Sequence, residues 1–195
     1  MATELFVADT ARQRVADSLE TTRRLLEGGE LDRVAVVAAL VADAYRGGGK
    51  TILFGNGGSA ADAQHVAAEF LGRYLLERPS LPAIALSEPS SLTAIGNDYA
   101  FADVFARQIE GLGRPGDVAI GISTSGSSEN VIRGIRAARV RGMLTIGLTG
   151  ANGRRLEEAA EHCIVIPSGE TPRIQEGHIL VCHVLCELVE QELFA

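Results

Sequence analysis

The sequence predicts an α/β fold in which a five-stranded parallel sheet is flanked by helices. From residue 51 onward, short apolar runs alternate with segments of helical periodicity. The runs are nearly continuous in apolar residues, which is typical of parallel strands covered on both faces. Two strand-to-helix turns are rich in glycine and serine. They are expected at the carboxyl ends of the strands, where such folds bind ligands.

Two helices precede the first strand, at 2–26 and 31–45, and glycine pairs or triplets end both of them. Their apolar positions recur at helical spacing, at Val15, Leu19, Thr22 and Leu26 in the first and Val34, Val37, Val41 and Ala44 in the second. Because both lie outside the strand–helix alternation, they cannot be crossovers between strands. They provide a subunit interface or cap the domain, and the pattern leaves both alternatives open.

The remaining elements alternate along the chain. The predicted strands are 51–54, 83–86, 117–122, 144–148 and 163–166. The predicted helices are 58–71, 90–95, 101–112, 128–141, 153–160 and 172–194. We therefore expect residues 1–195 to form a single domain, with helices in 1–48 and an α/β core in 49–195.

Composition narrows the class of protein. Apolar residues make up 46% of the 195 residues and charged residues 22%, as in an ordinary globular protein. The formal net charge is -7 and there is no basic run, so direct nucleic-acid binding is not expected. No apolar stretch reaches the roughly 20 residues that span a bilayer, and residues 1–14 lack a signal-peptide core. We expect a cytoplasmic protein without membrane contact, and three cysteines argue against a disulfide framework.

The first turn carries three glycines, Gly55, Gly57 and Gly58, between a buried strand and a helix start. Unpaired N–H groups at a helix N-terminus can hold an anion, and glycine allows a close backbone approach. His65 and Glu69 follow four residues apart on one helix face. This arrangement could serve a phosphorylated substrate, a metal or both. The alternatives are a plain α/β turn and a surface pair, because the turn matches neither G-x-G-x-x-G nor a P-loop.

The second turn supplies hydroxyl groups. Five of them follow the third strand, on Ser123, Thr124, Ser125, Ser127 and Ser128. Capping the next helix requires one hydroxyl, from Ser127 or Ser128. The surplus matches the several acceptor oxygens of a phosphate, although a solvated turn remains the alternative.

The last helix carries a second group of polar residues. Gln175 and His183 are eight residues apart and face similar sides. His178, Cys182 and Cys186 also follow helical spacing, but they lack the fourth ligand and the CxxC pair of a structural zinc site. Cysteines on an apolar helix are usually core residues, so we expect these two in the core.

Several spaced motifs resemble the sugar isomerase (SIS) domain and, within it, the bacterial phosphoheptose isomerases. They are Gly55–Ser59 with His65 and Glu69, the loop 123–128, Arg173-Ile174-Gln175-Glu176 with His183, Gly72-Arg73-Tyr74, Gly96-Asn97-Asp98 and Leu148-Thr149-Gly150. The resemblance covers nearly the whole chain. It implies a flavodoxin-like strand order and a homotetramer whose active sites lie at subunit interfaces.

The resemblance also implies an activity and its residues. The family converts sedoheptulose 7-phosphate to D-glycero-D-manno-heptose 7-phosphate through an enediol(ate), with Zn²⁺ as cofactor, one ion per subunit. By motif, Glu69 and His183 would be catalytic, and His65, Glu69, Gln175 and His183 would bind the metal. The substrate would contact Asn56, Gly57, Gly58, Ser59, Glu69, Asn97, Asp98, Ser123, Thr124, Ser125, Ser128 and Gln175.

A related family offers a rival function. The initiator-associating protein is a non-catalytic SIS-domain tetramer that binds the replication initiator DnaA, and 77–86 resembles it. That protein lacks counterparts of Glu69 and His183, whereas this chain has both. A sugar-phosphate-sensing regulator is a third class, but no basic helix here provides a DNA-binding domain. The sequence therefore favours the enzyme.

Overall fold

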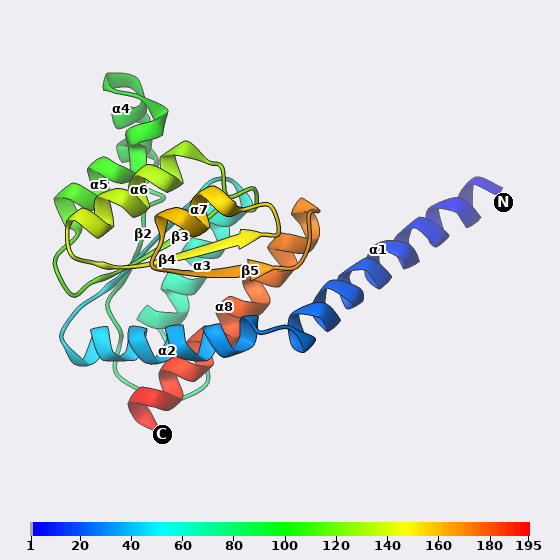
Figure 1. Cartoon of the computed structure of the whole chain (residues 1–195), viewed down its shortest axis with the longest axis horizontal. Helices are drawn as coiled ribbons and strands as arrows, with labels where there is room; N and C mark the ends of the chain where they lie inside the picture. The colour runs from blue at the N-terminus through cyan, green and yellow to red at the C-terminus, as the bar shows by residue number, and fades with distance from the viewer. Residues whose placement is uncertain (1) are drawn as a thin grey trace.

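The computed structural model describes residues 2–195 and confirms the parallel α/β fold (Figure 1). Five parallel strands form one sheet in the order β2-β1-β3-β4-β5. The strands are β1 (Thr51–Gly55), β2 (Ala83–Ala85), β3 (Val118–Ile122), β4 (Leu144–Gly150) and β5 (His162–Ile166). After β1 the chain moves to one side for β2 and returns on the other side for β3, so the strand order reverses between β1 and β3. Ligands bind at such a switch point.

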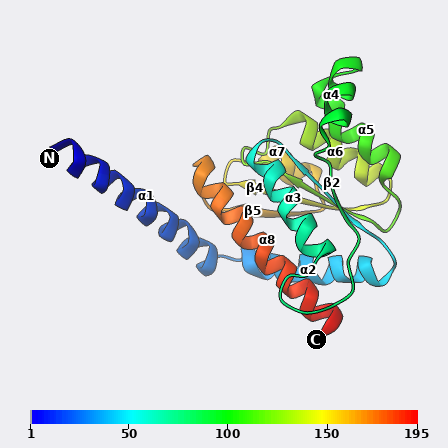
Figure 2. The same ribbon diagram turned by 180° about the vertical axis from the view of Figure 1, so that it is seen from behind.

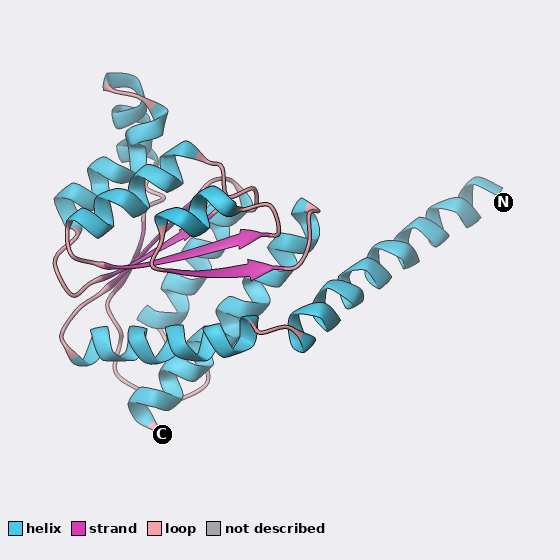
Figure 3. Ribbon diagram, in the orientation of Figure 1, coloured by secondary structure: helices cyan, strands magenta, loops and turns pink. Residues whose placement is uncertain are grey.

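Helices cover both faces of the sheet (Figures 1, 2 and 3). They are α1 (Ala2–Glu27), α2 (Glu30–Arg46), α3 (Gly58–Leu71), α4 (Pro89–Asp98), α5 (Val104–Leu112), α6 (Glu129–Val140), α7 (Arg154–Ala159) and α8 (Thr171–Phe194), with a 3₁₀ turn at Phe101–Asp103. The helices α2, α3 and α8 lie on one face, and α5, α6 and α7 lie on the other. The three central strands, β1, β3 and β4, are therefore shielded from water on both sides.

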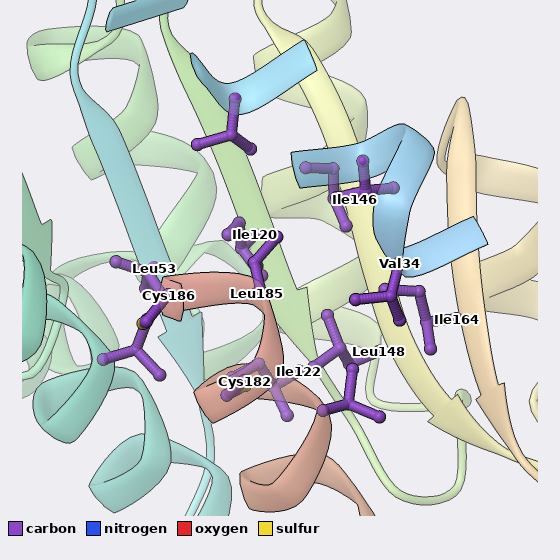
Figure 4. Close-up of a cluster of buried hydrophobic side chains, with 14 of the residues drawn as sticks. Val34, Leu53, Ile120, Ile122, Ile146, Leu148, Ile164, Cys182, Leu185 and Cys186 are labelled. Carbon is purple, nitrogen blue, oxygen red and sulfur yellow. The ribbon is translucent and has the colours of Figure 1, made fainter. Parts of the chain in front are cut away.

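The strands bury alternate side chains in two separate cores. In β1, Ile52 and Phe54 face α5 and α6, whereas Leu53 faces α3 and α8. Figure 4 shows the second core, where Leu185 of α8 and Val34 of α2 pack against β3, β4 and β5. Burial of these apolar surfaces holds α8 against the sheet.

One glycine sets how closely α8 approaches the sheet. A Cβ on Gly177 would lie 2.6 Å from Cγ2 of Ile166 on β5. Only glycine fits there without displacing the strand, so α8 runs close along the sheet with its polar residues aimed at α3.

Helix α1 projects away from the rest of the chain (Figures 1 and 2). Val15, Leu19 and Leu26 on its predicted apolar side are 62%, 67% and 70% exposed. The helix is attached by Nη1 of Arg173, which donates to the carbonyl of Arg14 at 2.9 Å, and by Leu25, which is 2% exposed and belongs to the core formed with α2 and α8. The predicted helix is therefore present, but Val15, Leu19 and Leu26 are left largely uncovered by the described residues.

The other differences from the predicted elements are small. Helix α4 begins at Pro89, because the Glu88 carboxylate caps it by accepting from the N–H of Ser91 at 2.7 Å. The predicted helix at 101–112 opens with a 3₁₀ turn before α5. Over residues 2–195, no helix is long and apolar enough to cross a bilayer.

Candidate active site

The glycine turn joins β1 to α3 and has a conformation that requires glycine. Gly57 has φ of +55°, in the left-handed region that favours glycine. A Cβ on Gly58 would lie 2.3 Å from Nε2 of Gln175, so the missing side chain makes room for that amide. The N–H groups of Ser59 and Ala60 donate to the carbonyls of Asn56 and Gly57 within the turn, both at 3.0 Å. The positive end of the α3 dipole lies at this turn, and anion binding there stays a prediction.

The serine loop joins β3 to α6, and its hydroxyls bond to one another. Oγ of Ser123 donates to Oγ of Ser128 at 3.0 Å, and Oγ of Ser127 donates to Oγ of Ser125 at 2.9 Å. Ser128 occupies the N-cap position of α6, but neither it nor Ser127 makes a side-chain capping bond. The capping prediction was therefore wrong, because the Ser128 hydroxyl bonds to Ser123 instead. These hydroxyls are gathered where a phosphate could replace their mutual bonds.

Two asparagines join the turns. Nδ2 of Asn56 donates to Oδ1 of Asn130, and Nδ2 of Asn130 donates to Oδ1 of Asn56, both at 2.9 Å. The two turns begin at the same position along the sheet, because Gly55 and Ile122 are register partners at the ends of β1 and β3. Asn130 is only 3% exposed, so this amide pair is shielded from competing water. The sequence pattern predicted no role for Asn130, because only the pairing of β1 with β3 brings it to Asn56.

Three candidate site residues meet between α3 and α8. Nε2 of His65 lies 2.9 Å from Nε2 of His183 and 3.3 Å from Oε1 of Glu69. For the two nitrogens to share a hydrogen bond, one ring must carry a proton on Nε2. The His65 side chain is 46% exposed, so this cluster is open on one side in the single chain. It combines a carboxylate with two imidazoles, the groups that most often move protons in enzymes.

Tyr74 lies against this cluster, although the sequence assigned it no chemical role. Its ring stacks on that of His183, with centroids 5.7 Å apart and planes 27° apart. Burial and then the nearby carboxylate of Glu187 raise the pKa of Tyr74, so the phenol stays neutral. Its position depends on the loop after α3, for which the sequence offers no periodic signal.

The donor set suits a divalent metal after a small movement. Two imidazoles and one carboxylate, with a position left open, are a common zinc set in catalytic sites. Two nitrogens on a tetrahedral zinc are about 3.3 Å apart, by geometry from the usual Zn–N length, whereas those of His65 and His183 are 2.9 Å apart. Accordingly, the described side chains form no ready-made group of three or more His, Cys, Asp or Glu for a metal. The rings would have to part by a few tenths of an ångström.

Gln175, the fourth metal ligand implied by the resemblance, lies elsewhere within the chain. Its amide is beside Gly58. Eight residues separate Gln175 from His183, which corresponds to about 12 Å along α8. The single chain therefore brings three of the four residues together.

The remaining candidates divide into two groups. Thr124 and Ser125 lie in the serine loop, whereas Ser59 is 4% exposed and packs under Gly55. Asn97 and Asp98 lie at the end of α4, where Nδ2 of Asn97 donates to Oδ1 of Asp98 at 2.9 Å. Helix α4 projects beyond the other helices of its face (Figure 1), and no described contact joins the pair to either turn.

The alternative zinc site on α8 is part of the core. Cys182 and Cys186 are buried among apolar side chains, as predicted (Figure 4). Burial raises the pKa of the Cys186 thiol to about 12 and also raises that of Cys182. Burial lowers the pKa of His178 to about 4. All three side chains are therefore neutral near pH 7, and neither cysteine is the thiolate that binds metals.

Fold and site together define an α/β domain with a glycine turn and a serine loop at the carboxyl edge of its sheet and a cluster of two imidazoles and a carboxylate further along α3. Comparison with known proteins agrees with this class. Residues 15–150 match the SIS domain family.

Close relatives narrow the class further. The chain is 57% identical over 160 residues to the phosphoheptose isomerase of Aquifex aeolicus, covering 82% of this chain and 84% of the relative. It is 48% identical over 185 residues to that of Sulfurimonas denitrificans, covering 94% and 95%. The structure of phosphoheptose isomerase from Neisseria gonorrhoeae superposes with a TM-score of 0.89 at 39% identity, covering 95% and 99%. The chain therefore belongs to the phosphoheptose isomerase family.

The amide pair leads to a prediction about substrate affinity. Asn130→Ala should raise KM about tenfold with a smaller change in kcat, because it frees the two turns that would hold a substrate in ground and transition states alike. Steady-state kinetics with a ketose phosphate measures both parameters. Asn152→Ala, on the exposed loop after β4, is the control. An unchanged KM in Asn130→Ala would show that the turns do not depend on this pair.

Proposed function

We propose that the chain isomerises sedoheptulose 7-phosphate to D-glycero-D-manno-heptose 7-phosphate through an enediol(ate). Membership of the phosphoheptose isomerase family gives the reaction class. The observation that carries the proposal is the meeting of Glu69, His65 and His183 along the helix that begins at the glycine turn. A protein used only as a scaffold for DnaA has no chemical need for this cluster.

The proposed roles follow from the chemistry of the reaction. Glu69 takes a proton from C1 of the ketose and returns one to C2, and His183 exchanges the protons of the O1 and O2 oxygens. No oxidant is needed, because the carbonyl moves from C2 to C1 within one molecule. The serine loop holds the phosphate through Ser123, Thr124, Ser125 and Ser128. The sugar contacts Asn56, Gly57, Gly58, Ser59 and Gln175.

We also propose one zinc ion per subunit, held by His65, Glu69 and His183, with Gln175 of a neighbouring subunit as the fourth ligand, because Gln175 of the same chain lies about 12 Å along α8 from His183. The support is the donor set and the short distance between the two imidazole nitrogens. When bound, zinc would polarise the carbonyl and stabilise the negative charge on the enediolate oxygens.

We further propose a homotetramer whose active sites lie at subunit interfaces. Two features support this assembly. The apolar side of α1 is uncovered, and the His65 cluster is open to solvent. A neighbouring subunit would cover the first and close the second, and its Asn97 and Asp98 could complete the site.

Removal of either proton-moving group tests the activity. Glu69→Gln and His183→Gln should each lower kcat about 10²–10⁴-fold, the usual contribution of one general acid or base. Glu157→Gln on α7 and His162→Gln on β5 are matched controls away from the site and should keep wild-type kcat. Turnover is followed by measuring the aldoheptose phosphate formed. Full activity of both site variants would refute the assigned roles, and a wild-type chain that binds DnaA without turnover would favour the scaffold function.

The zinc proposal is tested by metal content after dialysis against zinc. His65→Ala should hold far less than one ion per chain, because it removes one of two imidazole donors. Cys182→Ala, from the α8 core, should keep the wild-type content. Loss of zinc only in the cysteine variant would move the metal to α8.

Light scattering tests the assembly. The wild-type mass should be about four times the 20.6 kDa of one chain. Leu19→Glu should give a smaller species, because it places a charge on the apolar side of α1 where burial would be costly. Val140→Glu, at an 88% exposed position on α6, should keep the tetramer. A wild-type monomer at micromolar concentration would contradict the proposal.

A further inference from the structure

A buried ion pair lies directly behind the His65 cluster. Nε of Arg78 donates to Oε1 of Glu190 at 2.9 Å, and each side chain is 1% exposed. Removing one partner from such a pair leaves an uncompensated buried charge and is strongly destabilising. A pair of this kind is therefore well suited to hold its surroundings in one arrangement.

Arg78 fixes the end of α3. Its Nη2 donates to the carbonyl of Glu69 at 2.8 Å, and its Nη1 donates to the carbonyl of Phe70 at 2.7 Å. The last carbonyls of a helix have no partner inside it, so the guanidinium caps α3. The capped turn is the one that carries the Glu69 carboxylate.

Glu190 fixes the loop that follows. Its carboxylate accepts from the N–H groups of Tyr74, Leu75 and Leu76 at 2.7, 2.8 and 2.9 Å. Burial would raise the pKa of Glu190, but the backbone N–H groups and Arg78 lower it, so the carboxylate stays charged. Three successive amides on one carboxylate leave the backbone of Tyr74 little freedom.

The ring of Tyr74 in turn contacts the imidazole of His183. It stacks on the imidazole at 5.7 Å, while the His65 ring meets the same imidazole edge-on at 5.1 Å. His183 is thus held between two rings, one from α3 and one from the loop after it. The hydroxyl of Tyr74 has no hydrogen bond among the described residues, so the contact depends on the aromatic face.

We propose that Tyr74 is a positioning residue for His183, and that the Arg78–Glu190 pair sets its position together with that of Glu69. One buried pair would then fix the backbone of Glu69 directly and orient the ring of His183 through Tyr74, and these are the two groups assigned to proton transfer. This inference rests on the proposed function, since it specifies how the Glu69 and His183 side chains of that site are held in position.

Two substitutions of Tyr74 separate stacking from hydrogen bonding. Tyr74→Leu should lower kcat about 10–100-fold, as misplacing a reacting group by about 1 Å does, with KM nearly unchanged because the serine loop is intact. Tyr74→Phe should restore wild-type kcat, since it keeps the ring. Wild-type kcat in Tyr74→Leu, or a loss equally deep in Tyr74→Phe, would overturn the proposal.

A readout that does not depend on turnover comes from the imidazole itself. The chain has four histidines, so selective ¹³C labelling gives a simple spectrum, and His183→Gln assigns the signal. In the metal-free protein, Tyr74→Leu should shift the ring protons of His183 downfield, because the stacked ring no longer shields them. An unmoved signal would refute the stacking. If the wild type shows no turnover while this shift occurs, the proposed function fails and the positioning contact stands.

The ion pair has a matched control that makes no contact with the His65 cluster. Asp117, 3% exposed at the start of β3, also accepts from two backbone N–H groups and one cation, through Lys50 and Arg114. Glu190→Gln and Asp117→Asn should both lower the melting temperature, but only Glu190→Gln should lower kcat and shift the His183 signal. If both variants lose kcat in proportion to stability, or neither does, the pair is merely structural. Should Glu190→Gln not fold, Arg78→Lys, which keeps the charge but loses the cap on Glu69, takes its place under the same criteria.

Discussion

The side-by-side packing of α3 and α8 is the interaction on which the site depends. Gly58 faces Gln175 near the start of both helices, and His65 faces His183 about two turns further on. Beyond the end of α3, the following loop is held by Glu190, again about two turns after His183. The residue numbers of the contacting pairs increase along both helices, so α3 and α8 run in the same direction (Figure 2). The candidate site is therefore laid out along this seam, from the glycine turn to the Arg78–Glu190 ion pair.

The sheet supplies the other half of the arrangement. Parallel strands in register end at one edge, so the turns after β1 and β3 meet where the strand order reverses. The Asn56–Asn130 amide pair then locks the two turns together. Because α3 begins at the first of these turns, the proposed function puts the phosphate at one end of the α3–α8 seam and the proton-moving groups further along it. In that proposal, binding and chemistry use separate parts of the same frame.

The sequence predicted the features that follow from periodicity and local chemistry. Alternating apolar runs predicted the five strands, and glycine-rich and serine-rich segments predicted the two turns. The turns were expected to lie together because the carboxyl ends of parallel strands share one edge of the sheet. The core position of Cys182 and Cys186 followed from their apolar neighbours. Side-chain pairing between distant segments could not be predicted. Three such contacts depend on how strands and helices pack. They are the amide pair of Asn56 and Asn130, the stacking of Tyr74 on His183 and the position of the Gln175 amide beside Gly58. The hydroxyl bond that removes Ser128 from its capping role lies within one loop, and it depends on the loop conformation, which periodicity does not specify.

The central claim is that the His65–Glu69–His183 cluster moves a proton between adjacent carbons of a ketose phosphate. The most direct measurement is NMR of the wild-type reaction with sedoheptulose 7-phosphate in D₂O. A proton carried by a side chain exchanges with solvent, so the account predicts aldoheptose 7-phosphate with deuterium at C2, and deuterium appearing at C1 of the remaining ketose. Product that forms without any deuterium at C2 would show direct hydrogen transfer between the carbons and would contradict the account.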